Sequence, residues 1–556
     1  MPQTWKRFGL SSRNRSLLVF IIVCFVIFAR RPDRILNPQP YAEDGSTFIY
    51  QAIENPLGSL LTPYSGYLNC VPRIVTGLSL LAGMPVAPLL MDVSSLVISA
   101  FCISYLAWIR FRFLIANDWI RYILCILIAC IPNTEVFMNI TNIQWFLGIY
   151  VTLWALDQWQ NFETVETRQR ASSTLESGMA TVSNLSTAIG FLLIPILIYV
   201  ALKRLRPAKS KGFAVLVVIP IIGSFIQFLV FAMVPRFLEG NSENLVSAFH
   251  LSTGIMTNLV YENSTYIPAG TVLYILAIFV LAFSTVTYSF VRTRIGRDVR
   301  GWLLILSGAF ILAMVFFRTG IASVDRYFFF PSALLLILIV ASFQSLKRKR
   351  AQVFAIILLA VVGTNFAVHY MIPPSPDFKF QSYAKFYDPN GGSFIYAPIP
   401  PWAGFQDMGG WFCPIPASPV KIASSINLTT TYQAGSVILN VALAYPSDVR
   451  LGVSNSDLSV DKTNTTFVFL RGWTVGVTDP VNVFVIVDDV QAFPTSFGLN
   501  WYWGGTAPQG WDNSGWIGTI TLSGLSIGWH VVSFLVLTQS GVSYIATTKL
   551  SLNVYV

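Results

Sequence analysis

Long apolar stretches alternate with short polar ones through the first 370 residues of the chain. The first run, Ser16–Ala29, follows a basic segment, lacks a small-residue cleavage site and precedes Arg30 and Arg31. We therefore interpret it as a retained membrane helix and not as a removed signal peptide. Further runs of suitable length for membrane spans cover residues 86–109, 119–132, 143–157, 187–202, 213–234, 270–291, 301–317, 328–345 and 352–370.

Basic residues collect in the short loops between these runs, for example at Arg110 and Arg112 and in segments 203–211, 292–300 and 347–350. The positive-inside rule places such loops in the cytoplasm. Because the loop 158–176 also carries arginines, run 187–202 would then begin and end on the same side. We therefore expect segment 174–186 to rise partway into the membrane. It contains Ser, Thr and Asn, so it needs protein or water around it.

The predicted fold is thus mainly α-helical: a polytopic membrane protein with about eleven transmembrane segments over residues 1–370. We expect it in the plasma (inner) membrane, with a cytoplasmic N-terminus and a first external loop over residues 31–85. Everything after residue 370 is expected to be extracytoplasmic. Arg30, Arg31 and Arg34 conflict with this orientation, because they follow the first span.

Composition supports a membrane protein. Hydrophobic residues make up 54% of the chain and charged residues only 11%, against about 25% charged in soluble proteins. The net charge of +10 is uneven: residues 371–556 hold 7 Lys and Arg against 10 Asp, a net −3, which leaves +13 for the rest. The positive charge therefore indicates orientation in a bilayer and not a nucleic-acid partner.

The tail differs in pattern from the rest. Residues 371–419 are interpreted as a linker or irregular cap, and residues 420–556 as an extracytoplasmic β-sandwich domain, because short strand-like runs are separated there by Gly, Asn, Asp and Pro. Eight of the fifteen tryptophans lie in the tail. They either pack in the core of the sandwich, or are exposed and contact glycans or the membrane interface.

The most informative polar stretch is Pro40–Gly45, which contains Glu43 and Asp44 just after the first span. Two adjacent carboxylates at a membrane edge are costly and usually functional, although a solvated Asp-Gly turn is the alternative. Thr62–Tyr67 follows, with Tyr64 and Tyr67, and then Arg73. Its Pro, Gly and Tyr content is typical of a loop with a fixed backbone shape.

Lone charges elsewhere on the expected outer side need their own explanation. Glu135 is the only acid in its loop, and Arg236, Arg318 and Arg326, like Arg73, depart from the positive-inside trend. An arginine can bind a lipid phosphate in bidentate fashion or pair with a nearby acid.

This arrangement resembles the GT-C class of membrane glycosyltransferases, which use polyprenyl-phosphate-linked sugars as donors. A bacterial group with an AEDG…PYxGYL…PR run shows the pattern found here at Ala42–Gly45, Pro63–Leu68 and Pro72-Arg73. The resemblance covers roughly residues 1–370 and not the β-rich tail.

The resemblance implies an enzyme of cell-envelope polysaccharide biosynthesis that moves a sugar, with inversion, to an extracytoplasmic acceptor: a glycan, a lipid-linked glycan or a protein. Asp44 would be the general base, with Glu43 as the second choice. The site residues expected to bind the donor phosphate are Arg318, Arg326, Arg73 and Arg236, and those expected at the acceptor are Glu135, Tyr64 and Tyr67.

Class members differ in whether they need a divalent cation. Glu135 is the alternative ligand for one, and the sequence has no obvious multi-carboxylate cage. The rival functions are a transporter or flippase for a lipid-linked glycan, a glycan polymerase or ligase with two lipid-linked substrates, and a non-catalytic membrane scaffold that displays the β-domain.

Overall fold

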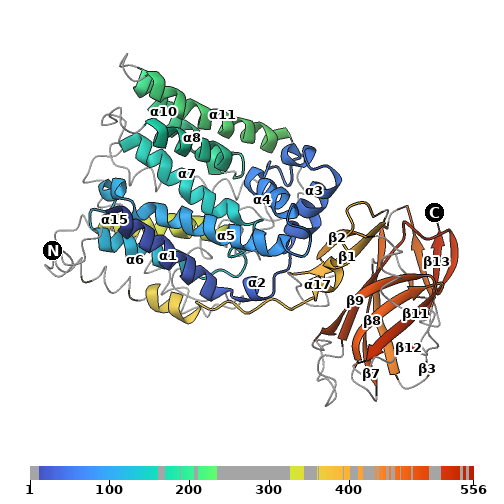
Figure 1. Ribbon diagram of the computed structural model, residues 1–556. Coiled ribbons are helices and arrows are strands. Elements are labelled where there is room, and N and C mark those ends of the chain that lie inside the picture. Colours follow the sequence, from blue (N-terminus) through green and yellow to red (C-terminus); the bar gives the residue numbers. More distant parts are fainter. Residues whose placement is uncertain are drawn as a thin grey trace, which may run out of the picture. The chain divides into compact units, whose positions relative to one another are not determined.

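The computed structural model describes most of the chain outside one large central segment. The described residues are 12–160, 170–205 except 188, 211–233, 326–343, 353, 360, 362–400 except 392, 411–417, 433–434, 437–445, 450–451, 457–463, 465–476, 480–499, 515–538, 543–545 and 550–555. They form a mostly helical part and a C-terminal β-rich part (Figure 1). The predicted runs 270–291 and 301–317 lie outside them.

The chain divides into two compact units. The first comprises Met1–Pro32, Leu60–Val75 and Asp92–Pro373, and the second comprises Asp33–Ser59, Thr76–Met91 and Pro374–Val556. The second unit thus groups parts of the predicted first external loop with the β-rich tail. A boundary near residue 370, drawn from composition, does not anticipate this grouping, because it depends on contacts between segments far apart in the sequence.

Every predicted apolar run that the structure describes contains helix. In chain order the helices are α1 (Ser12–Arg30), α2 (Asp33–Leu36), the π-helix η2 (Asp44–Ile49), α3 (Tyr50–Glu54), the 3-10 helix η3 (Gly58–Leu61), α4 (Cys70–Leu80), α5 (Ala87–Ser104), the 3-10 helices η4 (Tyr105–Ala107) and η5 (Ile109–Phe113), α6 (Asp118–Ala129), α7 (Ile143–Gln160), α8 (Arg170–Asn184), α9 (Ile189–Leu192), α10 (Ile194–Leu205), α11 (Lys211–Met233), α15 (Arg326–Phe343) and α17 (Phe380–Ala384).

Among the described residues, two segments, Ala87–Ala107 and Leu216–Met233, are long and apolar enough to cross a membrane. Length and composition alone do not separate such a helix from the core helix of a soluble protein.

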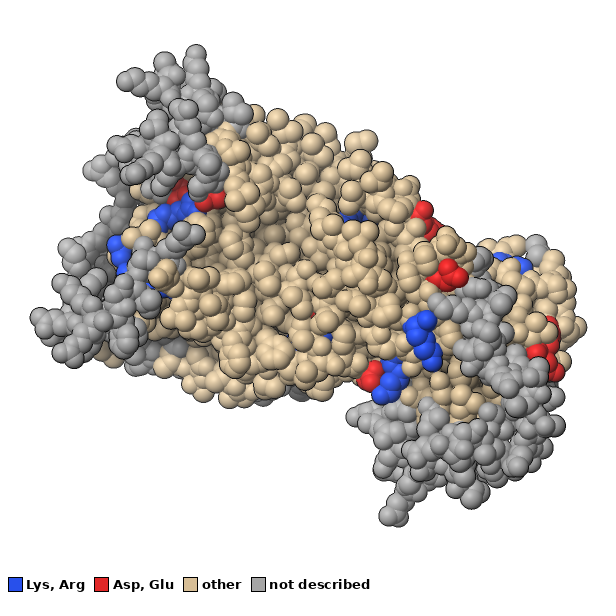
Figure 2. Space-filling model, in the orientation of Figure 1, with Lys and Arg blue, Asp and Glu red and all other residues tan. Residues whose placement is uncertain are grey.

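Several helices bury polar residues and expose apolar ones. On α4, Arg73, Thr76 and Ser79 are buried whereas Ile74 and Leu78 are exposed. The same inversion occurs on α5, where Asp92, Ser95 and Ser99 are buried and Val93 and Val97 are exposed, and on α11, where Ser224 and Gln227 are buried beside exposed Ile222 and Phe225. In the view of Figure 2, the helical part shows few charged side chains between its ends.

The polar segment predicted at 174–186 is the helix α8, which packs against both α7 and α11 (Figure 1). Polar side chains of α8 donate hydrogen bonds to backbone carbonyls of α11 around Pro220. Pro220 lies inside α11 and has no N–H, so the carbonyl of Leu216, four residues earlier, lacks its usual helical donor. The hydroxyl of Ser177 on α8 donates to this carbonyl, and Asn184 Nδ2 donates to the Pro220 carbonyl at 3.1 Å.

Arg30, the last residue of α1, has a structural role in the helical part. Arg30 is fully buried and donates to the carbonyls of Ala129 (2.7 Å) and Ile131 (3.0 Å) at the end of α6. Its Nε donates to the Tyr370 carbonyl at 2.9 Å, and its guanidinium lies 4.1 Å from the ring centre of Phe137. Arg30 therefore satisfies the open carbonyl end of a helix and ties three segments together.

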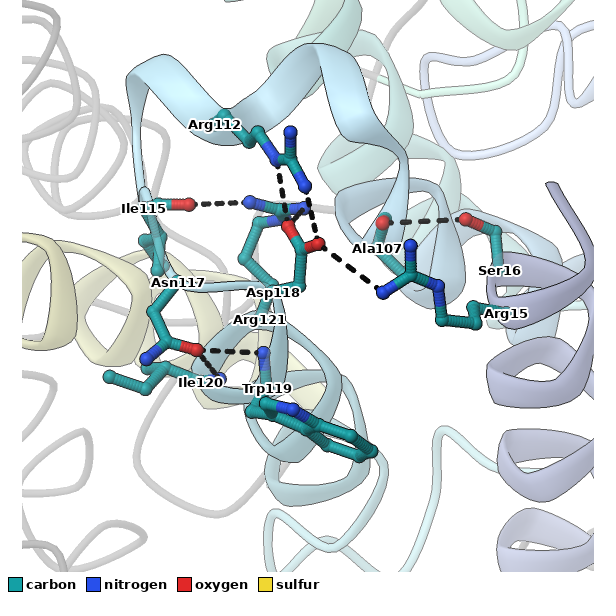
Figure 3. Close-up of polar contacts among 10 residues, drawn as sticks. All are labelled: Arg15, Ser16, Ala107, Arg112, Ile115, Asn117, Asp118, Trp119, Ile120 and Arg121. Carbon is teal, nitrogen blue, oxygen red and sulfur yellow. Dashed lines mark hydrogen bonds and ion pairs between the residues drawn. The ribbon is translucent and has the colours of Figure 1, made fainter. Parts of the chain in front are cut away.

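The opposite end of α6 carries a charged cluster (Figure 3). Asp118 accepts hydrogen bonds from Arg112 (2.9 and 2.6 Å) and Arg121 (2.6 Å), and Arg15 of α1 lies 3.8 Å away. Asn117 caps the helix by accepting from two backbone N–H groups. The hydrogen bond from Arg112, assisted by Arg121 against the effect of burial, lowers the pKa of Asp118 to about 2.

The β-rich part consists of the strands β1 (Ser393–Ile399), β2 (Trp411–Ala417), β3 (Gln433–Ala434), β4 (Val437–Tyr445), β5 (Arg450–Leu451), β6 (Asp457–Asp461), β7 (Phe467–Gly476), β8 (Pro480–Val487), β9 (Gln491–Leu499), β10 (Gly515–Thr521), β11 (Gly528–Thr538), β12 (Ser543–Ile545) and β13 (Leu550–Tyr555). β1 and β2 form an antiparallel hairpin. The others pair along one path, β4-β7-β10-β9-β8-β11-β13-β6-β5, with β12 and β3 beside it. The strand content expected after residue 420 is confirmed.

The hairpin β1–β2 lies within the predicted linker or cap at 371–419 and is tied to the larger sheet. The hydroxyl of Thr519 on β10 donates to the Tyr396 carbonyl on β1 at 3.0 Å. Phe378, Phe412 and Ile517 form a buried apolar cluster there. Segment 371–419 therefore includes strands that extend the β-rich part. Its Pro and Gly content predicted a linker or irregular cap instead.

His530 fastens β11 to the turn between β8 and β9. Its Nδ1 lies 2.6 Å from the Asp488 carboxylate and its Nε2 lies 2.9 Å from the Ser526 carbonyl. Because both partners are acceptors, the geometry favours the doubly protonated ring. Burial lowers the pKa of His530, but the hydrogen bonds to Asp488 and Ser526 outweigh it, and the net shift is upward.

Candidate functional site

The acid pair begins an unusual turn of helix. Asp44 is the first residue of the π-helix η2, and Glu43 precedes it as the N-cap. Ala42 just before them has φ of +46°, which is strained for a residue with a Cβ, and its N–H donates to the Pro400 carbonyl at 2.6 Å. Strained backbone and π-helical turns both concentrate at functional sites. The solvated-turn alternative is wrong, since both acids are buried.

The glycine that follows the acids is needed for packing. A Cβ at Gly45 would lie 2.5 Å from Ile399 Cδ1, 2.9 Å from Cys413 Cβ and 3.1 Å from Pro40 Cβ. η2 therefore lies directly on the hairpin β1–β2. The Ala42–Gly45 motif thus combines a structural glycine with two buried carboxylates, and the hairpin fixes where the carboxylates lie.

The two acids differ in their surroundings. Asp44 is 1% exposed and takes part in interactions with its neighbours. Glu43 is 8% exposed, and its Oε2 is a buried oxygen without a hydrogen-bond partner among the described residues. A buried carboxylate oxygen without a donor costs free energy, so Glu43 Oε2 is suited to accept a hydrogen bond from a ligand.

The second predicted group, Tyr64, Tyr67 and Arg73, forms a tight loop. The backbones of Tyr64 and Tyr67 exchange hydrogen bonds of 2.8 and 3.0 Å around a turn in which Ser65 and Gly66 have positive φ. Asn69 donates to the carbonyls of both tyrosines. Sequence reasoning did not single out Asn69, although an asparagine after a Gly-containing turn is a signal for this geometry.

This loop is held by the helices around it. The backbone N–H of Leu68 donates to Gln227 on α11 at 3.3 Å, and that of Val71 to Ser186 at 2.8 Å. The ring of Tyr67 lies 5.8 Å from that of Phe231. The Pro63–Leu68 motif, which carries much of the sequence resemblance, therefore forms a turn that is anchored to α11 and to the segment after α8.

Arg73 is buried and its Nε donates to the Leu68 carbonyl at 2.9 Å, which closes the start of α4. Burial lowers the pKa of Arg73 to about 10, so its guanidinium stays protonated at pH 7. The guanidinium of Arg73 thus hydrogen-bonds to the backbone of its own loop.

The third group pairs two predicted residues. Arg326, the first residue of α15, lies 3.6 Å from Glu135, and both side chains remain about one-quarter exposed. The Glu135 backbone is fixed by Asn133, Asn139 and Asn142, whose amides bond to its N–H or carbonyl. The pair is only partly exposed, so an anion would bind Arg326 by replacing Glu135 as its partner.

The groups are not all in one unit: the acid pair belongs to the second unit, and the other two groups belong to the first. Arg236 and Arg318 lie outside the described residues. Within the described residues, no group of three or more His, Cys, Asp or Glu side chains is placed to hold a metal ion.

Comparison with known proteins adds no assignment. No protein-family model matches the chain, and a search of curated proteins also finds no match.

Proposed function

We propose that this chain is an integral membrane glycosyltransferase of the GT-C type, which transfers a sugar from a polyprenyl-phosphate carrier to an extracytoplasmic acceptor. Membrane embedding is supported by the inverted burial on α4, α5 and α11, since water-soluble helices expose polar side chains and bury apolar ones. Contiguous exposed apolar surface on α1, at Leu17, Ile21 and Phe25, fits a lipid environment in the same way. The full set of about eleven spans belongs to this proposal, as does the two-layer sandwich form of the tail.

The observation that carries the catalytic part is the buried acid pair in its strained π-helical turn. In the proposed reaction, the Asp44 carboxylate takes the proton of the acceptor hydroxyl while that oxygen attacks the anomeric carbon. The bond from that carbon to the lipid phosphate breaks, and the configuration inverts. Glu43, with its open Oε2, binds a donor hydroxyl of the substrate and is the alternative base.

The leaving phosphate needs positive charge. Arg326 supplies it in this proposal, by exchanging its carboxylate partner Glu135 for the phosphate. Arg73 supports the loop, and its role is positioning, because its guanidinium is buried against the Leu68 carbonyl.

The test uses the full chain purified and reconstituted in lipid, with a panel of radiolabelled polyprenyl-phosphate hexoses and pentoses. Release of polyprenyl phosphate is the readout, because it reports bond cleavage whatever the acceptor. We expect Asp44→Asn to reduce release at least about a hundredfold, the lower range for loss of a general base, and Glu43→Gln to reduce it less.

Glu54→Gln is the matched control, since Glu54 is an exposed acid of the same segment that hydrogen-bonds Tyr50. If Asp44→Asn and Glu43→Gln both release polyprenyl phosphate at the wild-type rate, neither acid is the catalytic base. Transbilayer movement of a fluorescent lipid-linked glycan without release from any donor would favour a flippase.

A further inference from the structure

One face of the β-rich part exposes two aromatic side chains on neighbouring strands, Trp529 on β11 and Tyr555 on β13. At the start of β11, side chains alternate between exposed and buried: Trp529 is 63% exposed and Val531 is 48% exposed, whereas His530 and Val532 are buried. The next four side chains, residues 533–536, are all buried. A tryptophan this exposed is unusual, because burial of its large apolar surface is favourable. The alternation shows that Trp529 faces away from the core of the unit because of its position in the strand.

Strand register shows which residues share this face. β13 pairs with β11 so that Trp529 lies opposite Asn553 and Val531 lies opposite Ser551. Leu552 and Val554 between them are fully buried, and Tyr555 is 42% exposed. Residues directly opposite on neighbouring strands lie about 5 Å apart, within reach of one ligand ring.

The next strand continues the pattern with polar groups. β6 pairs with β13 so that Ser459 lies opposite Asn553 and Asp461 lies opposite Tyr555. Val460 between them is fully buried, so Ser459 and Asp461 are on the same side as Trp529. We call these residues the aromatic face: Ser459, Asp461, Trp529, Val531, Ser551, Asn553 and Tyr555.

The chemistry of the aromatic face fits a carbohydrate. A pyranose ring presents an apolar C–H surface that stacks on a flat aromatic ring, and hydroxyls at its edge that bond to amide, hydroxyl and carboxylate groups. An anionic bilayer surface is a poorer partner, because it attracts Lys and Arg and repels a carboxylate. The aromatic face instead includes a carboxylate, and Lys462, next to Asp461, donates to the Leu525 carbonyl at 2.6 Å.

We propose that the aromatic face is a binding platform for a neutral glycan chain, with Trp529 as the stacking anchor and Asn553 and Ser459 as hydrogen-bonding groups. This site is separate from the acid pair, and it does not depend on the proposed transfer reaction. It would hold such a chain and raise its local concentration at the protein.

The test measures retention of the full chain, in detergent micelles, on immobilised α-mannan, β-glucan and galactan. We expect at least one of these to retain the protein, and Trp529→Ala to weaken the apparent affinity about tenfold, while Trp529→Tyr keeps most of it. Val490→Ala is the matched control: Val490 is equally exposed, at 68%, but lies in the β8–β9 turn outside the aromatic face.

Hydrogen exchange of residues 527–531 gives an independent readout, and it should slow when the retained polysaccharide is added. The proposal fails if no polysaccharide retains the protein, or if Trp529→Ala is retained as strongly as the wild type. Slowed exchange in lipid nanodiscs but not with polysaccharide would assign the face to the membrane. Since no readout involves sugar transfer, failure here leaves the proposed enzymatic function standing.

Discussion

The contact between α8 and α11 allows a quantitative test of why a polar helix lies among apolar ones. In α11, Pro220 deprives the Leu216 carbonyl of its helical donor, and Ser177 of α8 supplies a hydroxyl instead. Ser177→Ala should therefore leave a carbonyl without a donor in a largely apolar environment. Interhelical hydrogen bonds of this kind contribute about 0.6 kcal/mol on average and at most about 1.7 kcal/mol in membrane proteins. We expect a loss near the upper value, because Ser177 is buried and water cannot replace it.

The perturbation that isolates this effect is Pro220→Ala, which restores the N–H to residue 220. In that background Ser177→Ala should cost little, so a double-mutant cycle should give a coupling energy of about 1 kcal/mol. The assay is equilibrium unfolding of the full chain in mixed micelles, followed by the loss of helical circular dichroism. Four proteins are needed: the wild type, both single variants and the double variant.

Two controls separate the mechanism from general disturbance of α8. Asn184 donates to the Pro220 carbonyl, which alanine retains, so the cost of Asn184→Ala should be the same in both backgrounds. Gly178→Ala should not destabilise, because its Cβ meets no atom within 4 Å. A coupling energy between Ser177 and Pro220 within about 0.3 kcal/mol of zero would refute the reasoning, since that is the additivity expected of independent sites.

Further predictions concern Gly45, the buried Arg30 and the ion pair between His530 and Asp488. Gly45→Ala should destabilise the protein by about 1–3 kcal/mol, measured by thermal unfolding, because its Cβ would clash with Ile399; an unchanged melting temperature would contradict the close packing. Arg30→Gln should cost about 2–3 kcal/mol, measured in the same way, by leaving buried carbonyls at the end of α6 without donors. Because the folded-state pKa of His530 is raised, its contribution is complete below its ordinary pKa and is lost as pH rises through the raised value. Asp488→Asn should therefore lower the melting temperature more at pH 5.5 than at pH 9. An equal effect at both would exclude a stabilising ion pair between His530 and Asp488.

Local pattern was enough to predict several features. The apolar runs predicted helices at α1, α5, α6, α7, α10, α11 and α15, because a run of apolar residues reports the environment of the whole segment. The strand-rich tail was predicted from short strand-like runs separated by Gly, Asn, Asp and Pro. The acids Glu43 and Asp44 also stood out, since charges are scarce in the chain and these two follow an apolar run directly.

The roles of single polar residues required the tertiary structure. The sequence places Arg30 against the positive-inside trend and gives no reason for its charge. The structure supplies one, because Arg30 donates hydrogen bonds to carbonyls at the end of α6 and to the Tyr370 carbonyl. Glu135 and Arg326 were each predicted as ligand-binding residues, but a pairing across so much sequence is invisible to local pattern. The sequence predicts Tyr64 and Tyr67 as acceptor contacts, and the structure adds that their backbones build a tight turn.

By itself, the sequence determined that the chain is largely helical and apolar, that its tail is rich in strands, and where its scarce charges lie. The tertiary structure decided what each of these residues meets. Trp516 is 1% exposed and Trp529 is 63% exposed, although both are tryptophans in strands of the same tail. Similarly, Gly45 is restricted by a hairpin more than 340 residues away in the sequence. The physical reason is that hydrophobic pattern sets the environment of a segment, whereas burial, clashes and hydrogen-bond partners are set by segments that only folding brings together.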